Sequence, residues 1–201
     1  MKTTIIYLLI IALCVSMLVN SCAAGKNNIV IAEANIENVN EKAGCYVVLK
    51  DGTVKNYSTL KLVTGIFKTP HLLADGSVKI LPGSIKEYKD ANYYAIAQNE
   101  FYNKVKTHVA TNVLPGFAVR EIKGDLNVYS IQFYNGSNVY KKYFLQKGKD
   151  GKIAPYTAQL LNEYAKDNEE VKNFLSKKKS NQKQLLAVVN NYNNSQSISR
   201  N

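Results

Sequence analysis

The chain of 201 residues is poor in the residues on which several classes of functional site depend. It has no tryptophan, two histidines, three cysteines and four prolines. Three cysteines are too few for a disulfide-dense scaffold, and His71 and His108 lie too far apart in the chain to form a spaced zinc motif. Glycine-rich phosphate loops and the Gly-x-Ser-x-Gly motif of hydrolases are missing as well. We therefore expect neither a metal nor a cofactor, and no sequence motif identifies a catalytic residue.

A short apolar run at the N-terminus predicts an export signal. Met1 and Lys2 form a small positive region, and the almost unbroken apolar stretch 5–19 follows. A membrane-spanning helix needs about 20 apolar residues, so this stretch is too short to span a bilayer and is typical of a signal peptide. We therefore assign residues 1–21 to a signal peptide.

The residues that follow resemble the lipobox of bacterial lipoproteins. Segment 19–22 reads Val-Asn-Ser-Cys, with an apolar residue three positions before Cys22 and a small residue directly before it. The resemblance implies that Cys22 becomes the lipidated N-terminus of the mature protein. The protein would then be anchored to a membrane of the cell envelope and face the periplasm or the exterior. Cys14 fits less well, because the bulky Leu13 precedes it.

Ordinary secretory cleavage is the alternative, since Ala23 and Ala24 are small enough for a cleavage site, and it would release a soluble secreted protein. In both cases the mature chain has no second free thiol to pair with Cys45. An alternating apolar run begins at Cys45, so we predict that this thiol is buried in the core. The residues 22–43 are rich in asparagine and small side chains, and we interpret them as a tether.

The region 44–155 predicts an antiparallel β-rich body built of hairpins. Asp-Gly and Asn-Gly pairs accept the positive φ angles of tight turns, and such turn dipeptides separate apolar runs along this region. The pairs are Asp51-Gly52, Asp75-Gly76, Gly124-Asp125, Asn135-Gly136 and Asp150-Gly151. We predict strand pairing of 46–50 with 53–57 and of 126–134 with 139–146, further strands at 92–98 and 117–123, and a short helix within 99–113.

The region 156–192 predicts C-terminal helices that pack on this body, which makes the fold class α+β. Thr157 can cap the first helix, and Asp167 with Glu170 resembles the start of a second. The segment 176–184 is polar throughout, so one long helix and two shorter helices both fit the pattern. The remaining residues, 193–201, we interpret as a frayed tail.

Positive charge is the feature that could attract a partner, because the formal net charge is +11. Only Arg120 and Arg200 are arginines, whereas specific nucleic-acid recognition depends on arginine, so we expect no nucleic-acid partner. The cluster Lys177, Lys178 and Lys179 could contact an anionic headgroup or a polysaccharide. The alternative is an ordinary solvated helix face.

Taken together, these patterns favour an exported, lipid-anchored envelope protein that acts as a non-catalytic binding or structural module. Its partner would be the membrane through the anchor, and in addition an envelope protein or a polysaccharide. A hydrolase of envelope polymers and a cationic surface-binding protein are the two alternatives. A hairpin body followed by a helical tail also resembles uncharacterised envelope proteins, and this resemblance implies no site residues.

Overall fold

The structure is a computed structural model that describes residues 44–65, 67–102, 112–135, 138–177 and 181–198. By its internal contacts the chain separates into residues 1–36 and residues 37–201, and all described residues belong to the second unit. Cys22, the signal peptide and the tether therefore lie outside the described residues. Among the helices that are described, none is long and apolar enough to cross a membrane.

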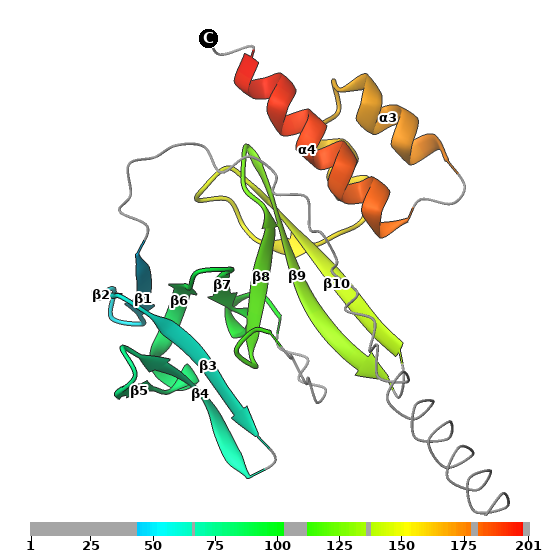
Figure 1. Cartoon of the computed structure of the whole chain (residues 1–201). Helices are drawn as coiled ribbons and strands as arrows, with labels where there is room; N and C mark the ends of the chain where they lie inside the picture. The colour runs from blue at the N-terminus through cyan, green and yellow to red at the C-terminus, as the bar shows by residue number, and fades with distance from the viewer. Residues whose placement is uncertain (1–43, 66, 103–111, 136–137, 178–180, 199–201) are drawn as a thin grey trace, which may run out of the picture. The chain divides into compact units, whose positions relative to one another are not determined.

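The described strands form an eight-stranded and a three-stranded sheet, and all pairs between the described strands are antiparallel (Figure 1). The order in the large sheet is β11-β10-β9-β8-β7-β6-β1-β2, and in the small sheet β3-β4-β5. The large sheet comprises β1 (Cys45–Leu49), β2 (Val54–Tyr57), β6 (Ile85–Lys89), β7 (Tyr94–Ala97), β8 (Phe117–Ile122), β9 (Leu126–Asn135), β10 (Asn138–Lys147) and β11 (Ala154–Pro155). The small sheet comprises β3 (Leu60–Gly65), β4 (Lys68–Ala74) and β5 (Val78–Ile80).

Turn chemistry explains the hairpins. Gly52 links β1 to β2 with a φ of +86°, and Asp75 and Gly76 link β4 to β5 with φ angles of +48° and +72°. These left-handed conformations suit Gly and, among other residues, Asp or Asn, which is why these dipeptides mark tight turns. The predicted pairings of 46–50 with 53–57 and of 126–134 with 139–146 are confirmed.

One face of the large sheet, the first face, is covered in its β1, β6 and β7 part by the small sheet. Val47 and Tyr88 from the large sheet and Leu72 from the small sheet are fully buried members of one core cluster. Cys45 belongs to the same cluster and is 7% exposed, which confirms its predicted burial. Burying these apolar side chains is the main stabilising contribution of this part of the fold.

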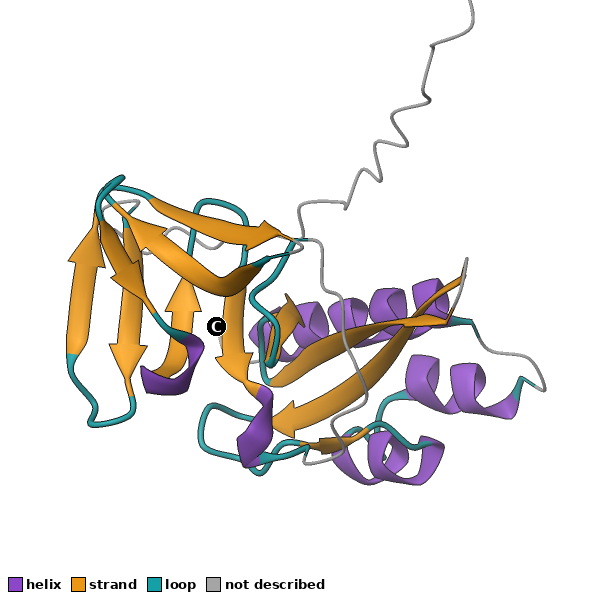
Figure 2. Cartoon of the chain, turned by 90° about the horizontal axis from the view of Figure 1, so that it is seen from below, coloured by secondary structure: helices purple, strands orange, loops and turns teal. Residues whose placement is uncertain are grey.

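The C-terminal helices cover the β8–β10 part of the first face. They are α2 (Ala158–Tyr164), α3 (Glu169–Ser176) and α4 (Gln182–Ile198), and α4 contacts β8 and β9. Val128 and Leu145 from the strands pack with Leu161, Val171 and Val189 from the helices, all fully buried. Figure 2, seen from below, shows the helices gathered beside β9 and β10.

The α+β class is confirmed, with a β-rich region followed by three described helices, while several helix boundaries differ from the prediction. Thr157 caps α2 by accepting a hydrogen bond from the Leu160 backbone N–H at 3.0 Å, as expected. The cap of α3 is Asn168, not Asp167, because the Asn168 amide oxygen accepts from the Val171 N–H.

The polar segment separates α3 from α4, so two helices follow α2 rather than a single long one. The boundary placed at residue 193 is wrong, since α4 continues to Ile198 and Asn193 is only 9% exposed. Most of the helix predicted within 99–113 falls outside the described residues. Its first residues belong to the 3₁₀ turn η2 (Gln98–Glu100), and a second such turn, η1 (Pro82–Ser84), precedes β6.

Candidate binding site

The opposite side of the large sheet, the second face, has a different composition from the helix-covered one. Cross-strand pairing places Glu87, Ile96 and Ala118 in one row across β6, β7 and β8, and Arg120 opposite Tyr129 in β8 and β9. The buried cluster on this face contains Ala118, Tyr129, Ile131 and Phe144, and its described partly buried neighbours come from strands and loops and not from α2, α3 or α4. These neighbours are Tyr94, Ile96, Phe101, Tyr102, Phe133 and Ile153.

A chain of polar contacts crosses the second face from β6 to β9. The Tyr94 hydroxyl donates to Glu87 Oε2 at 2.8 Å, and the Arg120 guanidinium carbon lies 3.8 Å from the centroid of the Tyr94 ring. Arg120 also lies opposite Tyr129 in the strand pairing, and its charge opposes the rise that burial causes in the pKa of the Tyr129 hydroxyl. A guanidinium held over an aromatic face gains electrostatic attraction from the ring, so Arg120 is fixed between two tyrosines.

The chain continues from Tyr129 to the loop after β10. The Tyr129 hydroxyl donates to Gln146 Oε1 at 3.0 Å. Gln146 Nε2 in turn donates to the carbonyl oxygens of Lys149 at 3.0 Å and of Gly151 at 2.9 Å. Gln146 is buried, and these bonds satisfy both its oxygen and its nitrogen while they fix the course of loop 148–153.

Tyr94 and Tyr129, the two tyrosines in this series of polar contacts, act as hydrogen-bond donors and not as bases. Burial raises the pKa of Tyr94, and the nearby Glu87 carboxylate raises it further. Burial also raises the pKa of Tyr129, although Arg120 partly opposes this shift. Both hydroxyls therefore stay protonated at neutral pH, and the contacts organise the face without transferring protons.

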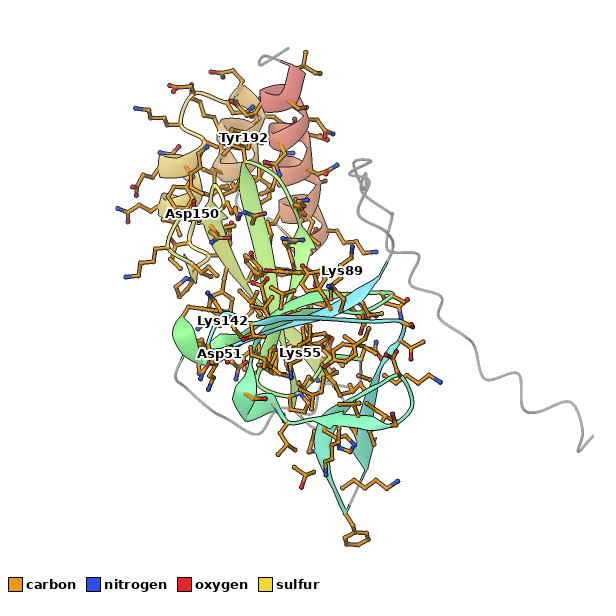
Figure 3. The ribbon with its side chains drawn as sticks, turned by 90° about the vertical axis from the view of Figure 1, so that its left-hand side faces the viewer. Asp51, Lys55, Lys89, Lys142, Asp150 and Tyr192 are labelled. Carbon is orange, nitrogen blue, oxygen red and sulfur yellow. The ribbon has the colours of Figure 1, made fainter. Side chains whose placement is uncertain are left out.

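Beside this series of polar contacts lies a group of aromatic rings in edge-to-face contact. The ring centroids of Phe101 and Phe144 are 5.0 Å apart, and Tyr102 lies 5.6 Å from Phe144 and 6.3 Å from Phe133. Lys142 Nζ sits 4.5 Å from the centroid of Tyr102. In Figure 3, Lys142 lies on the sheet and Tyr192 lies near the helices. The second face thus combines apolar rings with two cationic side chains, Arg120 and Lys142.

A pocket of about 600 Å³ opens at the edge of this group. It is lined by Ile96, Phe101, Gln146 and the segment 151–155. Its rim is tightly built at Gly151, where a Cβ atom would come within 2.0 Å of the Lys147 carbonyl oxygen, so only glycine fits. The volume lies within the range of about 300–1,000 Å³ that is typical of small-ligand sites.

The described pocket lining consists mainly of apolar side chains and backbone polar groups. Phe101 and Ile96 supply apolar surface, and segment 151–155 supplies backbone polar groups. Among the described lining residues, Lys152 is the one ionisable side chain, so no carboxylate–histidine or carboxylate–carboxylate pair faces the pocket. General acid–base catalysis needs a titratable side chain positioned within hydrogen-bond reach of the substrate.

The structure does not bring the sequence-predicted site residues into this pocket. Lys177 is exposed directly after α3, and Lys178 and Lys179 lie outside the described residues, as does Cys22. His71 is half-buried in β4, where its Nδ1 atom lies 2.8 Å from the Thr69 carbonyl oxygen. Within the described ranges no group of three or more His, Cys, Asp or Glu residues could hold a metal ion.

A second hollow of about 310 Å³ lies between β10 and the helices α3 and α4. Tyr143, Phe174 and Leu185 contribute to its lining, and Asn181 borders it just after the lysine cluster. Burial raises the pKa of Tyr143 to about 12, with a smaller contribution from Glu121. The hollow sits beside buried core residues of the helix interface, so we regard it as a packing feature of that interface.

Sequence reasoning missed Arg120, Tyr94 and Gln146. One signal was present, since Arg120 is one of two arginines in a chain with 24 lysines. A search for relatives found no family model, no curated protein and no solved structure that matches the chain.

Proposed function

We propose that the protein is an exported envelope protein, anchored by lipid on Cys22, that acts as a non-catalytic binding module. The pocket on the second face is the proposed binding site. The observation that supports binding over catalysis is the pocket lining, which in its described part combines an aromatic ring, an amide and backbone groups with a single ionisable side chain, Lys152.

The pocket favours a polysaccharide over a protein as the ligand. A stable protein partner requires about 800 Å² of surface on each side, whereas a pocket of about 600 Å³ accommodates a short segment of a chain molecule. Phe101 supplies a ring against which a sugar can stack, and Lys152 at the pocket, with Lys142 nearby on the face, favours acidic sugars. We therefore propose an acidic envelope polysaccharide as the ligand.

A binding experiment tests the site. Unlipidated full-length protein carrying Cys22→Ser is titrated with polygalacturonate as an acidic probe and with dextran as a neutral one. Phe101→Leu keeps apolar volume but removes the ring, and we expect about three- to tenfold weaker binding. Lys152→Gln should weaken binding to the acidic probe in a salt-dependent way, while Lys79→Gln, an exposed change on β5, should have no effect.

Two outcomes would contradict this proposal. Equal binding of the wild-type pocket and both pocket variants would show that the polysaccharide binds elsewhere or not at all. Release of new reducing ends from the acidic probe by the unmodified protein would show an enzyme instead of a binding module.

The anchor is tested separately in cells. Cys22→Ser should move the protein from the membrane fraction to the soluble exported fraction or stop its processing, because two acyl chains bind a bilayer far more firmly than surface charge. Mass spectrometry of the mature N-terminus provides the direct measurement. An unmodified chain that begins at Ala24 or Gly25 would show free secretion.

A further inference from the structure

The hairpin of β3 and β4 extends beyond the small sheet to which it belongs. β3 and β4 pair from Leu60 with Ala74 to Gly65 with Lys68, whereas β5 pairs only with the segment 72–74 of β4. The outer half of the hairpin is therefore a two-stranded ribbon, and Figure 1 shows it projecting from the other strands. Its base is firmly held, because Leu60, Leu72 and Ala74 are buried in the core.

An unusually exposed aromatic side chain lies at the tip of this ribbon. Phe67 is 98% exposed, which is the highest value among the exposed large hydrophobic residues that the structure describes. An exposed phenyl ring on a projecting turn contributes nothing to the core, so it is free to contact a surface outside the fold.

The whole β3–β4 hairpin is free of acidic residues. From Leu60 to Ala74 the sequence contains Lys61, Lys68 and His71 and no Asp or Glu. The Lys68 side chain extends from the residue next to Phe67 and passes within about 3.6 Å of the position that a Cβ on Gly65 would occupy. Apolar and cationic groups thus stand side by side at the tip.

We infer that the β3–β4 tip inserts Phe67 into the interface of an anionic lipid bilayer, while the neighbouring Lys68 contacts the headgroups. The inference rests on the proposed membrane location of the protein. An aromatic residue with an adjacent lysine matches the boundary between acyl chains and charged headgroups. A protein partner is disfavoured, because a narrow ribbon tip offers far less than the roughly 800 Å² that a stable interface needs on each side.

The absence of tryptophan from the chain allows a direct test. Phe67→Trp in full-length Cys22→Ser protein introduces a single tryptophan at the tip. With vesicles of mixed phosphatidylcholine and phosphatidylglycerol, we expect its emission to shift to shorter wavelength and its quenching by aqueous iodide to fall. Val139→Trp, at a position that is 52% exposed on β10, is the matched control and should show neither change.

Vesicle sedimentation measures the contribution of each residue. Phe67→Ser should lower the partition coefficient about tenfold or more, because the ring no longer transfers from water. Lys68→Gln should lower it about fivefold at low salt. The triple replacement of Lys177, Lys178 and Lys179 by Gln should leave it unchanged. Because Phe67 is exposed, circular dichroism of all variants should match that of the parent protein.

Several results would overturn the inference. One is an emission spectrum of the Phe67→Trp protein that vesicles do not change. Another is vesicle binding that Phe67→Ser leaves intact and that the triple lysine replacement abolishes. Equal binding to vesicles of pure phosphatidylcholine would refute the role of Lys68. Because the test protein is unlipidated, these results are independent of whether Cys22 is the anchor in cells.

Discussion

Asn193 of α4 offers the sharpest test of how the helices dock on the large sheet. Its Oδ1 accepts a hydrogen bond from the Leu126 backbone N–H at 2.8 Å, and its Nδ2 donates to the Leu126 carbonyl oxygen at 3.0 Å. The last pair between β8 and β9 joins Ile122 and Val128, so within the described residues Leu126 has no strand partner from β8. The side-chain amide takes the place of that partner.

The size of the effect of removing this amide follows from burial. Leu126 is fully buried and Asn193 is 9% exposed, so water does not readily replace the amide. Asn193→Ala leaves one backbone donor and one backbone acceptor unpaired, and each such group costs about 1–3 kcal/mol. We expect the free energy of unfolding to fall by about 2–6 kcal/mol, which is a large part of the roughly 5–15 kcal/mol of an ordinary domain.

Gly124 provides an independent check of the same contact. A Cβ atom at this position would lie 2.3 Å from Asn193 Nδ2, so Gly124→Ala must displace the amide. In the Asn193→Ala background that clash is gone, so adding Gly124→Ala should lower the free energy of unfolding little further. The double variant should therefore be about as stable as Asn193→Ala alone, so the two changes are strongly non-additive.

Urea unfolding followed by far-ultraviolet circular dichroism measures these free energies on the Cys22→Ser protein. Asn194→Ala is the matched control, since Asn194 is the exposed neighbour on the same helix. A loss below about 0.5 kcal/mol for Asn193→Ala, or additive losses in the double variant, would refute the proposed role of the amide.

Three further predictions concern stability. Burial, with a smaller contribution from Glu121, raises the pKa of Tyr143 to about 12, so Tyr143 ionises at lower pH in the unfolded chain than in the folded protein. The free energy of unfolding should therefore be unaffected below about pH 10 and should decline between about pH 10 and 12. Tyr143→Phe should flatten part of that decline in pH-dependent melts. A strong chelator should leave the melting temperature unchanged, and a fall of several degrees would reveal a required metal. Thr157→Ala and Asn168→Ala each remove a helix cap and should each lower the free energy of unfolding by about 1 kcal/mol in urea titrations. If neither variant loses stability, the caps do not contribute to it.

Much of the large sheet could be predicted from the sequence because its hairpins depend on local turn chemistry. Asp51 illustrates this, since its carboxylate accepts from the Thr53 N–H at 2.8 Å within the turn between β1 and β2. Helix starts are local as well, and Thr157 was identified correctly from its position before the apolar stripe of α2. Asn168 was missed because Asp167 is an equally good capping residue and only the backbone course distinguishes the two.

The turn between β4 and β5 carries the Asp75-Gly76 signal, but the β3–β4 hairpin and the C-terminal end could not be predicted in this way. The tip of the β3–β4 hairpin has no Asn-Gly or Asp-Gly pair, and Gly65 is its sole glycine, so the sequence shows no strong turn signal there. The polar sequence around Asn193 is typical of a frayed tail. Only its long-range bonds to Leu126, 67 residues earlier, show that the helix continues and is buried at that point.

The candidate site was out of reach for a related reason, which is the β-bulge in β8. Regular alternation would place Arg120 and Ile122 on the same face of the strand. The register shift between them pairs Arg120 with Tyr129 and Ile122 with Val128, so Glu121 is the extra residue. Glu121 accepts from Ser130 Oγ at 2.5 Å and from Lys141 Nζ at 2.6 Å, and Ile122 joins the core beneath the helices.

This single extra residue serves both faces at once. Without it, a one-residue slip would exchange the faces of the side chains beyond the bulge. Either Ile122 would leave the helix-covered core, or Arg120 would leave the tyrosines and point toward that core. The bulge resolves the conflict between an apolar residue required on one face and a guanidinium required on the other. A periodic pattern cannot reveal such a device, since the bulge is defined by pairing with β9 and not by the sequence of β8 itself.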